Sequence, residues 1–273
     1  MKKYCVIGNP AKHSLSPFIH NKLYELYGIN ECIYETRELT SAELSTFIEK
    51  LAAEQIAGFN ITMPYKKDIQ PYLDELDPSA AYGVNTVVVK NSRLHGYSTD
   101  AAGFKKGLEG IGFSYKYKNI VFIGCGAVAQ SLIQDAKQSG ARKIVVVNRT
   151  LGHAQELADG HVILADSLSN LGKYMKNCNL LVNTTPLGMQ GMELEFDSLS
   201  FLNLLPHESS VCDLIYHPAK TKLLCRANEL GHKTLNGLPM LIWQAFFAFR
   251  YFLGIMPTSQ DFDTIMGLIE ARI

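Results

Sequence analysis

Residues 119–129, N-I-V-F-I-G-C-G-A-V-A, carry the clearest fold signal in this 273-residue chain. A mainly apolar run ends at Gly124, as expected of a buried strand, and a helical pattern follows to about Ser139. The stretch fits G-x-G-x-x-[GA], where the first glycine permits a tight turn and the second lets backbone approach a pyrophosphate. The small Ala129 lets the helix pack close to the strand, and the helix N-terminus faces the phosphate charge. A tight turn without a ligand is the alternative.

Further strand signals follow this stretch at regular spacing. They lie at residues 143–147, 161–164, 179–183 and 210–214, with helical or loop sequence between them. This alternation predicts a doubly wound, parallel nucleotide-binding domain. After Gly237 the pattern is helical to the end of the chain.

The first hundred residues also alternate between strand and helix signals, which favours a largely parallel sheet. The predicted elements are a strand at 4–8, a helix at 16–27, a helix with a capping box from Thr40 to about Ala53, a strand at 56–62, a helix from Pro64, and a hairpin of 84–89 and 93–97.

The end of the second nucleotide-domain strand indicates which dinucleotide binds. NAD-binding domains place Asp or Glu about 20 residues after the glycines, on the ribose 2′-hydroxyl. Here the strand ends Asn148-Arg149-Thr150, without a carboxylate. A guanidinium can hold a 2′-phosphate and stack on adenine, so we expect NADP. A solvated arginine at a strand end is the alternative interpretation of Arg149.

Composition excludes several classes of protein. Lys plus Arg and Asp plus Glu both number 26, so nothing indicates a nucleic-acid-binding surface. The six cysteines form no C-x-x-C pair and no zinc-like cluster, and the N-terminus lacks a signal segment, so we expect a reduced, cytoplasmic protein without a metal. The apolar stretch 238–256 is interrupted by Gln244 and Arg250, which favours a buried core helix over a membrane span.

Polar residues at predicted element ends form a second candidate site. Ser14 and Ser16 precede or open a helix, where hydroxyls can bind a carboxylate, although Ser16 is equally suited to be the N-cap. Lys66 follows a strand end, and a lone lysine is usually solvated. Asp100 precedes a helix and has the N-cap as its alternative role. Gln244 lies in an apolar helix, where a buried amide needs protein or ligand partners.

Taken together, the motifs resemble those of the shikimate dehydrogenases, in the same order and over about residues 6–254. They are G-N-P-x-x-H-S-x-S-P-x-x-H-N from Gly8, N-I-T-M-P-Y-K from Asn60, G-V-N-T-V from Gly83, S-T-D-A-A-G-F from Ser98, G-C-G-A-V-A from Gly124, N-R-T from Asn148 and N-G-L-P-M-L-I-W-Q-A from Asn236.

The resemblance implies a role for each matching residue. Lys66 and Asp100 would be the catalytic pair. Substrate would contact Ser14 and Ser16 through its carboxylate, Thr62, Asn85 and Gln244 through its ring hydroxyls, and Tyr216. The phosphates and adenosine of the cofactor would contact Gly124, Gly126, Ala127, Asn148, Arg149 and Thr150. The nicotinamide would contact Thr184, Leu187, Met189, Gly237 and Met240.

The resemblance also implies the α/β fold and the reaction. Residues 1–100 would form an N-terminal α/β substrate domain, 101–237 a Rossmann NADP-binding domain, and 238–273 a C-terminal helical segment returning to the first domain, with the active site in the cleft between domains. The reaction would be reversible NADPH-dependent reduction of 3-dehydroshikimate to shikimate, in the biosynthesis of chorismate and aromatic amino acids. The small-molecule substrate would be the partner, without nucleic acid or membrane, in a monomer or homodimer.

Two departures leave alternatives open. The family's usual N-T-D-G is Ser98-Thr99-Asp100-Ala101 here, so the turn loses an amide and a glycine. Many NADP-specific members carry a second Arg where this chain has His153, and a neutral imidazole binds phosphate less well, so NAD use is possible. The alternatives are a quinate/shikimate dehydrogenase using NAD or NADP, and a catalytically silent NADP-binding regulatory paralogue.

Overall fold

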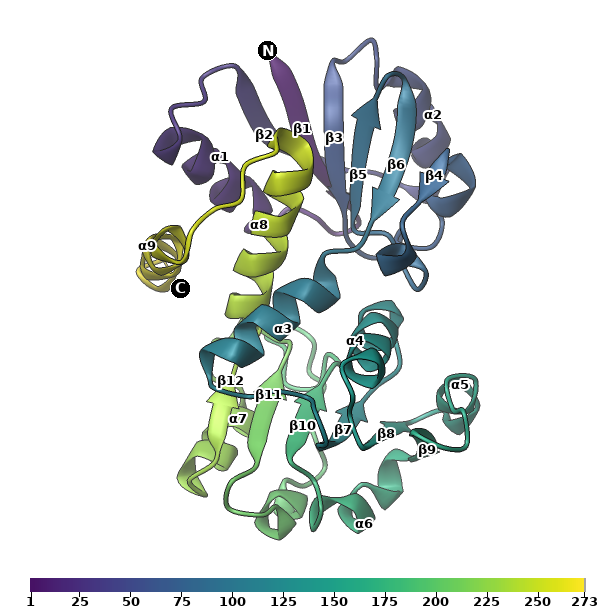
Figure 1. Cartoon of the computed structure of the whole chain (residues 1–273), viewed down its shortest axis with the longest axis vertical. Coiled ribbons are helices and arrows are strands. Elements are labelled where there is room, and N and C mark those ends of the chain that lie inside the picture. Colours follow the sequence, from purple (N-terminus) through teal and green to yellow (C-terminus); the bar gives the residue numbers. More distant parts are fainter. Residues whose placement is uncertain (273) are drawn as a thin grey trace. The chain divides into compact units, whose positions relative to one another are not determined.

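The structure is a computed structural model that describes residues 1–272 and contains two compact units (Figure 1). The first unit comprises Met1–Gly103 and Leu241–Arg272, and the second comprises Phe104–Met240. Within these residues, no helix combines the length and the apolar character that crossing a membrane requires.

The first unit is built on a mixed six-stranded sheet of order β2-β1-β3-β5-β6-β4 (Figure 1). Strands β1, β2 and β3 are parallel, whereas β5 runs antiparallel to both β3 and β6. The elements that lie wholly within this unit are β1 (Lys2–Gly8), α1 (Ser16–Leu26), β2 (Cys32–Glu38), η1 (Ser41–Glu43), α2 (Leu44–Lys50), β3 (Ile56–Ile61), η2 (Gln70–Tyr72), β4 (Glu75–Leu76), η3 (Pro78–Ala80), β5 (Thr86–Lys90), β6 (Arg93–Tyr97) and α9 (Ser259–Glu270).

Alternate residues of β1 serve the two faces of this sheet. Cys5 and Ile7 are part of a buried cluster to which α2 contributes Phe47. On the opposite face, the Tyr4 ring packs 4.8 Å from Phe252, a residue of helix α8 (Leu238–Leu253). Because side chains alternate across a strand, one apolar run can bury both faces. The C-terminal segment therefore completes the core of the first unit.

The second unit is a six-stranded sheet of order β12-β11-β10-β7-β8-β9 in which every neighbouring pair is parallel. Numbered from β7, this is the order 3-2-1-4-5-6 of dinucleotide-binding domains, and it reverses between β7 and β10. The elements of this unit are β7 (Asn119–Ile123), α4 (Ala127–Gln138), β8 (Lys143–Asn148), α5 (Leu151–Gln155), β9 (Ile163–Ser167), η4 (Leu168–Asn170), α6 (Gly172–Met175), β10 (Leu180–Asn183), η5 (Ser200–Leu204), β11 (Ser210–Asp213), α7 (Lys222–Glu229) and β12 (Lys233–Leu235). Helix α3 (Asp100–Gly110) begins in the first unit and ends in the second.

The predicted nucleotide-domain strands and the hairpin are confirmed. Strands β5 and β6 pair across Asn91 and Ser92, which both have positive φ, as a two-residue hairpin turn requires. The capping box is also confirmed, because the Thr40 amide donates to Glu43 Oε2 over 2.7 Å. The helix expected from Pro64 is wrong: this segment forms turns followed by the short η2 helix.

Candidate active site

The polar residues after β1 and β3 lie at one edge of the first sheet, because these strands are parallel and adjacent. A Cβ on Gly8 would overlap the side chain of Thr62, so the two loops pack directly against each other. Asn85 joins this edge from the start of the antiparallel strand β5, and its carbonyl accepts from the Ile61 amide over 2.9 Å. Residues far apart in the sequence are thereby placed together.

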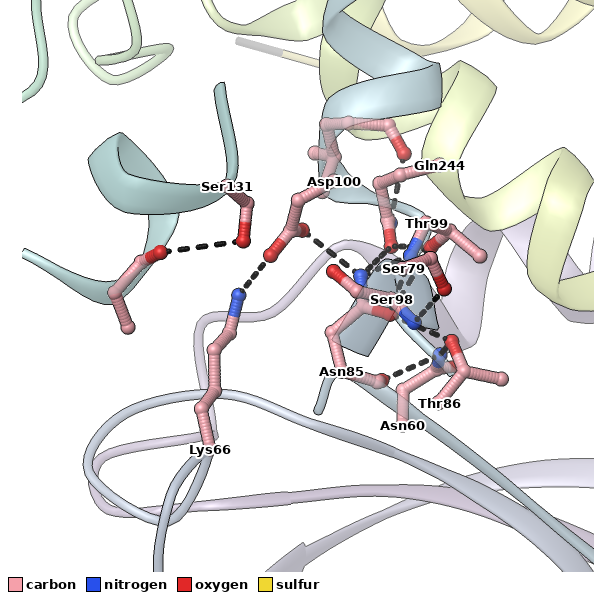
Figure 2. A network of polar contacts seen from close by, with 12 residues as sticks. Asn60, Lys66, Ser79, Asn85, Thr86, Ser98, Thr99, Asp100, Ser131 and Gln244 are labelled. Carbon is pink, nitrogen blue, oxygen red and sulfur yellow. Dashed lines mark hydrogen bonds and ion pairs between the residues drawn. The ribbon is translucent and has the colours of Figure 1, made fainter. Parts of the chain in front are cut away.

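Lys66 and Asp100 form an ion pair at this edge (Figure 2). Lys66 Nζ lies 2.5 Å from Asp100 Oδ2, and the two side chains are only 12% and 8% exposed. Lys66 is held by its backbone, because its carbonyl accepts from the Val84 amide over 2.8 Å. Asp100 is the first residue of α3, where a carboxylate is favoured by the helix dipole. Lys66 is therefore not a solvated lysine, and Asp100 does more than begin a helix.

Asn85 holds the second oxygen of the Asp100 carboxylate. Its Nδ2 donates to Asp100 Oδ1 over 2.8 Å and to Thr99 Oγ1 over 2.9 Å (Figure 2). Its Oδ1 accepts from the Thr99 amide over 2.9 Å. Since a different group donates to each carboxylate oxygen, the plane of the carboxylate is fixed.

The Lys66 ammonium has donor capacity left for a ligand. An ammonium carries three N–H donors, and within residues 1–272 one of them is used, in the hydrogen bond to Asp100. The remaining donors can reach an oxygen of a bound molecule. Charge pairing with a buried carboxylate stabilises the ammonium, so the site can present a proton to an oxygen that gains negative charge.

Gln244 connects α8 to the same network. Its Oε1 accepts from Asn85 Nδ2 over 3.3 Å and from Thr99 Oγ1 over 3.4 Å, while its Nε2 donates to the Leu241 carbonyl over 2.9 Å (Figure 2). The amide expected to need partners in an apolar helix therefore has protein partners, and the side chain is half-buried.

Ser14 and Ser16 lie at the start of α1, which follows β1. The N-cap is Leu15 and not Ser16, because Ser16 already has entered the helix, followed by Pro17. Ser14 Oγ accepts from the Ser16 amide over 3.2 Å, which satisfies that helix donor instead. The N-cap interpretation of Ser16 is thus wrong, and its hydroxyl is not used for capping. Thr62 is half-buried at the neighbouring loop.

Asp100 keeps its hydrogen-bond partners although Ser98 and Ala101 stand where the family usually has Asn and Gly. The Ser98 amide donates to Ser79 Oγ over 3.1 Å, while the buried Ser98 hydroxyl has no partner within residues 1–272. Ala101 continues the first turn of α3 as an ordinary helical residue. The carboxylate position depends on Lys66 and Asn85, neither of which the departure changes.

The glycine loop of the second unit fits a dinucleotide. Gly124 has φ +100°, and a Cβ there would lie 2.6 Å from Thr184 Oγ1, so no larger residue suits this turn. Gly126 is the N-cap of α4, and a Cβ there would meet no atom within 4 Å. The space beside Gly126 and the amides from Ala127 onward form a cradle of the kind that receives a pyrophosphate.

The end of β8 presents the predicted adenosine contacts to solvent. Asn148 Nδ2 donates to the Thr150 carbonyl over 2.9 Å, which closes the turn into α5. Arg149, Thr150 and His153 are all exposed. A guanidinium in this position is available to a 2′-phosphate, which suits NADP.

The predicted nicotinamide contacts lie after β10 and β12. Thr184 Oγ1 donates to the Ile123 carbonyl over 2.7 Å, and the Asn183 side chain donates to the Leu187 carbonyl over 3.3 Å. A Cβ on Gly237 would overlap the Leu214 carbonyl, so only glycine permits this approach. The remaining predicted contacts in this unit are Met189, whose amide donates to the Pro186 carbonyl, the buried Met240, and Tyr216 after β11, whose pKa burial raises.

Sequence reasoning missed some of the residues that hold these sites. In the sequence, Thr99 is distinguished only by its place in S-T-D-A-A-G-F, yet it contacts both Asn85 and Gln244. Asp213 is buried and hydrogen-bonded to Asn183. A charged residue directly after the apolar pair Val211-Cys212 was the available signal for Asp213.

Comparison with known proteins identifies the family. Residues 6–87 match the shikimate dehydrogenase substrate binding domain, and residues 108–188 match the shikimate / quinate 5-dehydrogenase family. Over 259 residues the chain is 39% identical to the shikimate dehydrogenase (NADP(+)) of Alkaliphilus oremlandii, covering 90% of this chain and 89% of that one. The chain belongs to the shikimate dehydrogenase family.

Solved structures of family members have the same fold. The shikimate 5-dehydrogenase of Thermus thermophilus, crystallised with NADP(H) and shikimate, is 32% identical with a TM-score of 0.83, over 96% of this chain and 97% of that one. The quinate dehydrogenase of Corynebacterium glutamicum, crystallised with NAD, is 29% identical with a TM-score of 0.86, over 97% and 99% of the two chains. The fold is thus shared by members that differ in substrate and cofactor.

Proposed function

We propose that this protein is a shikimate dehydrogenase that reversibly reduces 3-dehydroshikimate to shikimate with NADPH. The observation that carries the proposal is the Lys66–Asp100 pair, whose charged atoms lie 2.5 Å apart in a largely buried position. A regulatory paralogue that only binds NADP has no need of such a pair. NADPH, when bound, supplies the hydride that reduces the ketone carbon.

In the proposed mechanism, the Lys66–Asp100 pair donates a proton to the substrate oxygen and accepts it in the reverse direction. Hydride addition places negative charge on the ketone oxygen, and an ammonium donor near that oxygen both stabilises the charge and delivers a proton. Asp100 orients the ammonium, and Asn85 orients Asp100. In the oxidative direction the same pair accepts the proton from the shikimate hydroxyl.

The other residues at this edge would bind the ring. We propose that the hydroxyls of Ser14 and Ser16 bind the carboxylate, since Ser16 Oγ is not used for capping α1 and Ser14 Oγ, which accepts from the Ser16 amide, keeps its own O–H donor. Thr62, Asn85 and Gln244 would hold the ring hydroxyls, and Tyr216 would contact the substrate. The first unit would therefore be the substrate domain and the second the NADP domain.

The proposed cofactor site consists of the glycine loop and the end of β8. Gly124, Gly126 and Ala127 would receive the pyrophosphate, and Asn148, Arg149 and Thr150 the adenosine end. Thr184, Leu187, Met189, Gly237 and Met240 would line the nicotinamide. The exposed Arg149 favours NADP, while His153 in place of a second arginine favours some use of NAD.

A matrix of initial rates tests this proposal. Rates are measured with NADP and NAD, each on shikimate and on quinate. The highest kcat/KM for NADP with shikimate is expected. Preference for quinate or NAD would favour a quinate/shikimate dehydrogenase, and tight NADPH binding without turnover would favour the regulatory paralogue.

Lys66→Ala tests the residue roles directly. Turnover should fall severely while shikimate affinity changes little, because ring contacts from other residues remain. Near-normal turnover in this variant would contradict the assignment of Lys66.

A further inference from the structure

The function proposed above assigns no step to a buried polar cluster at the end of β11, formed by Asp213, Asn183 and Thr221. Asp213 and Asn183 are 0% exposed and Thr221 is 1% exposed. The core of this unit is formed by apolar side chains. Charged residues are rarely this deeply buried unless they are paired or hydrogen-bonded, so the arrangement requires a reason.

Asp213 joins three segments through its carboxylate. Oδ1 accepts from Asn183 Nδ2 over 3.0 Å and from the Ile215 amide over 3.2 Å. Oδ2 accepts from Thr221 Oγ1 over 2.7 Å. One side chain therefore connects the end of β10, the turn that leads to Tyr216, and the start of α7.

Asn183 connects Asp213 to the loop after β10. Its Oδ1 accepts from the Thr185 amide over 3.1 Å and from Thr185 Oγ1 over 2.6 Å. Its Nδ2, which binds Asp213, also donates to the Leu187 carbonyl over 3.3 Å. The backbone of residues 184–187 thus takes its shape from a side chain that Asp213 orients.

Thr221 supports the same loop from the other side. Its Oγ1 accepts from the Leu224 amide and caps α7. A Cβ on Gly188, which has φ +95°, would lie 3.7 Å from Thr221 Cβ, so the loop packs closely against this residue. The loop at 184–188 is consequently held on two sides by partners of one carboxylate.

We propose that Asp213 is a positioning residue that fixes the loop 184–189 and the turn before Tyr216 in the shape that receives the nicotinamide end of the cofactor. This inference rests on the proposed function. It predicts that loss of Asp213 impairs hydride transfer more than cofactor affinity. The glycine loop and Arg149 would bind the pyrophosphate and the adenosine end of NADPH independently of Asp213.

Asp213→Ala tests the inference. A small displacement of reacting groups reduces rates strongly, so kcat should fall by about tenfold to a hundredfold while the Kd for NADPH changes by less than about threefold. The primary isotope effect with NADPH deuterated at the transferred position should rise, because hydride transfer becomes slower. Asp213→Asn retains an acceptor for Asn183 and Ile215 and should recover most of the rate.

Two further variants separate positioning from stability. Thr221→Val removes one hydrogen bond to Asp213 and Thr221→Ser retains it, so only the former should lower kcat. Ser209→Ala is the matched control: Ser209 is 1% exposed, precedes the same strand, and donates to the Cys178 carbonyl over 2.7 Å. Its loss should lower the Tm and leave kcat and the isotope effect unchanged.

The outcomes distinguish this inference from the proposed function. If Asp213→Ala and Thr221→Val lower only the Tm, as Ser209→Ala does, the positioning role is refuted. If Asp213→Ala does not fold, Thr221→Val against Thr221→Ser decides. If the wild-type protein does not oxidise shikimate, the proposed function fails. The fluorescence change of NADPH on binding then tests the loop instead: an altered change in Thr221→Val but not in Ser209→Ala supports the inference, and equal changes overturn it.

Discussion

Neutralising Lys66 should reduce both turnover and stability, and also neutralising Asp100 should cause no further loss of stability while restoring no turnover. Lys66→Met keeps much of the side-chain length but removes the charge 2.5 Å from Asp100 Oδ2. The carboxylate that remains is 8% exposed and keeps one side-chain donor, Asn85. Asp100→Asn creates the converse problem, a largely buried ammonium without its counterion.

The distance and burial set the magnitude. At 2.5 Å, two unit charges attract by about 7 kcal/mol at an effective dielectric constant near 20. Desolvation offsets part of this attraction, and removing one partner of a buried pair costs about 3–5 kcal/mol. Lys66 is 12% exposed, and Asp100 keeps its hydrogen bond from Asn85. We therefore expect each single variant to lose about 3 kcal/mol of unfolding free energy, the lower end of this range.

The double variant Lys66→Met/Asp100→Asn has no unpaired charge at this site. Its loss of stability should be about 3 kcal/mol smaller than the sum of the two single losses. Each single variant should lower the Tm by about 6–12 °C relative to wild type, as measured by thermal unfolding. Shikimate oxidation should fall by at least about a hundredfold in all three variants, because the proton-transfer group is absent or misdirected.

Two results would refute this reasoning. Strictly additive losses of stability would show that Lys66 and Asp100 do not interact in the folded protein. Recovery of turnover in the double variant would show that the pair is structural and takes no part in proton transfer.

Three other predictions concern the second unit. Gly124→Ala should destabilise the protein because its Cβ would lie 2.6 Å from Thr184 Oγ1 at φ +100°, whereas Gly126→Ala should keep the Tm and weaken NADPH binding, measured by fluorescence titration. Arg149→Gln should lower the ratio of kcat/KM for NADPH to that for NADH without changing the Tm, because Arg149 is exposed; an unchanged ratio would argue against a 2′-phosphate contact. Burial raises the pKa of Asp213 to about 6, above its ordinary value, so its contribution to stability is full below about pH 4 and is lost as the pH rises through 6. The stability of Asp213→Asn relative to wild type should therefore increase by up to about 3 kcal/mol from pH 4 to pH 7, measured by urea unfolding, and a constant difference would contradict the raised pKa.

The nucleotide-binding unit could be predicted because its signals are local. The strand, the glycine loop and the helix around residues 119–129 are contiguous, and Gly124 has the positive φ, +100°, that a tight turn requires. The hairpin turn at Asn91 and Ser92 is equally local. The helix expected from Pro64 failed because a proline suits a helix start and a turn alike, and the packing of this loop at the sheet edge determines the outcome.

The family could be recognised from the sequence alone, and with it the residues proposed for both sites, because the motifs occur in order along nearly the whole chain. From the sequence alone, Lys66 could equally be a solvated lysine and Asp100 a helix cap. Only the tertiary structure brought their charged atoms to 2.5 Å and placed Asn85 on the second carboxylate oxygen. The buried role of Asp213 is also visible only there, because its partners come from residues 183, 215 and 221. Burial and hydrogen bonding depend on how distant segments pack, whereas strand, turn and helix signals depend on neighbouring residues.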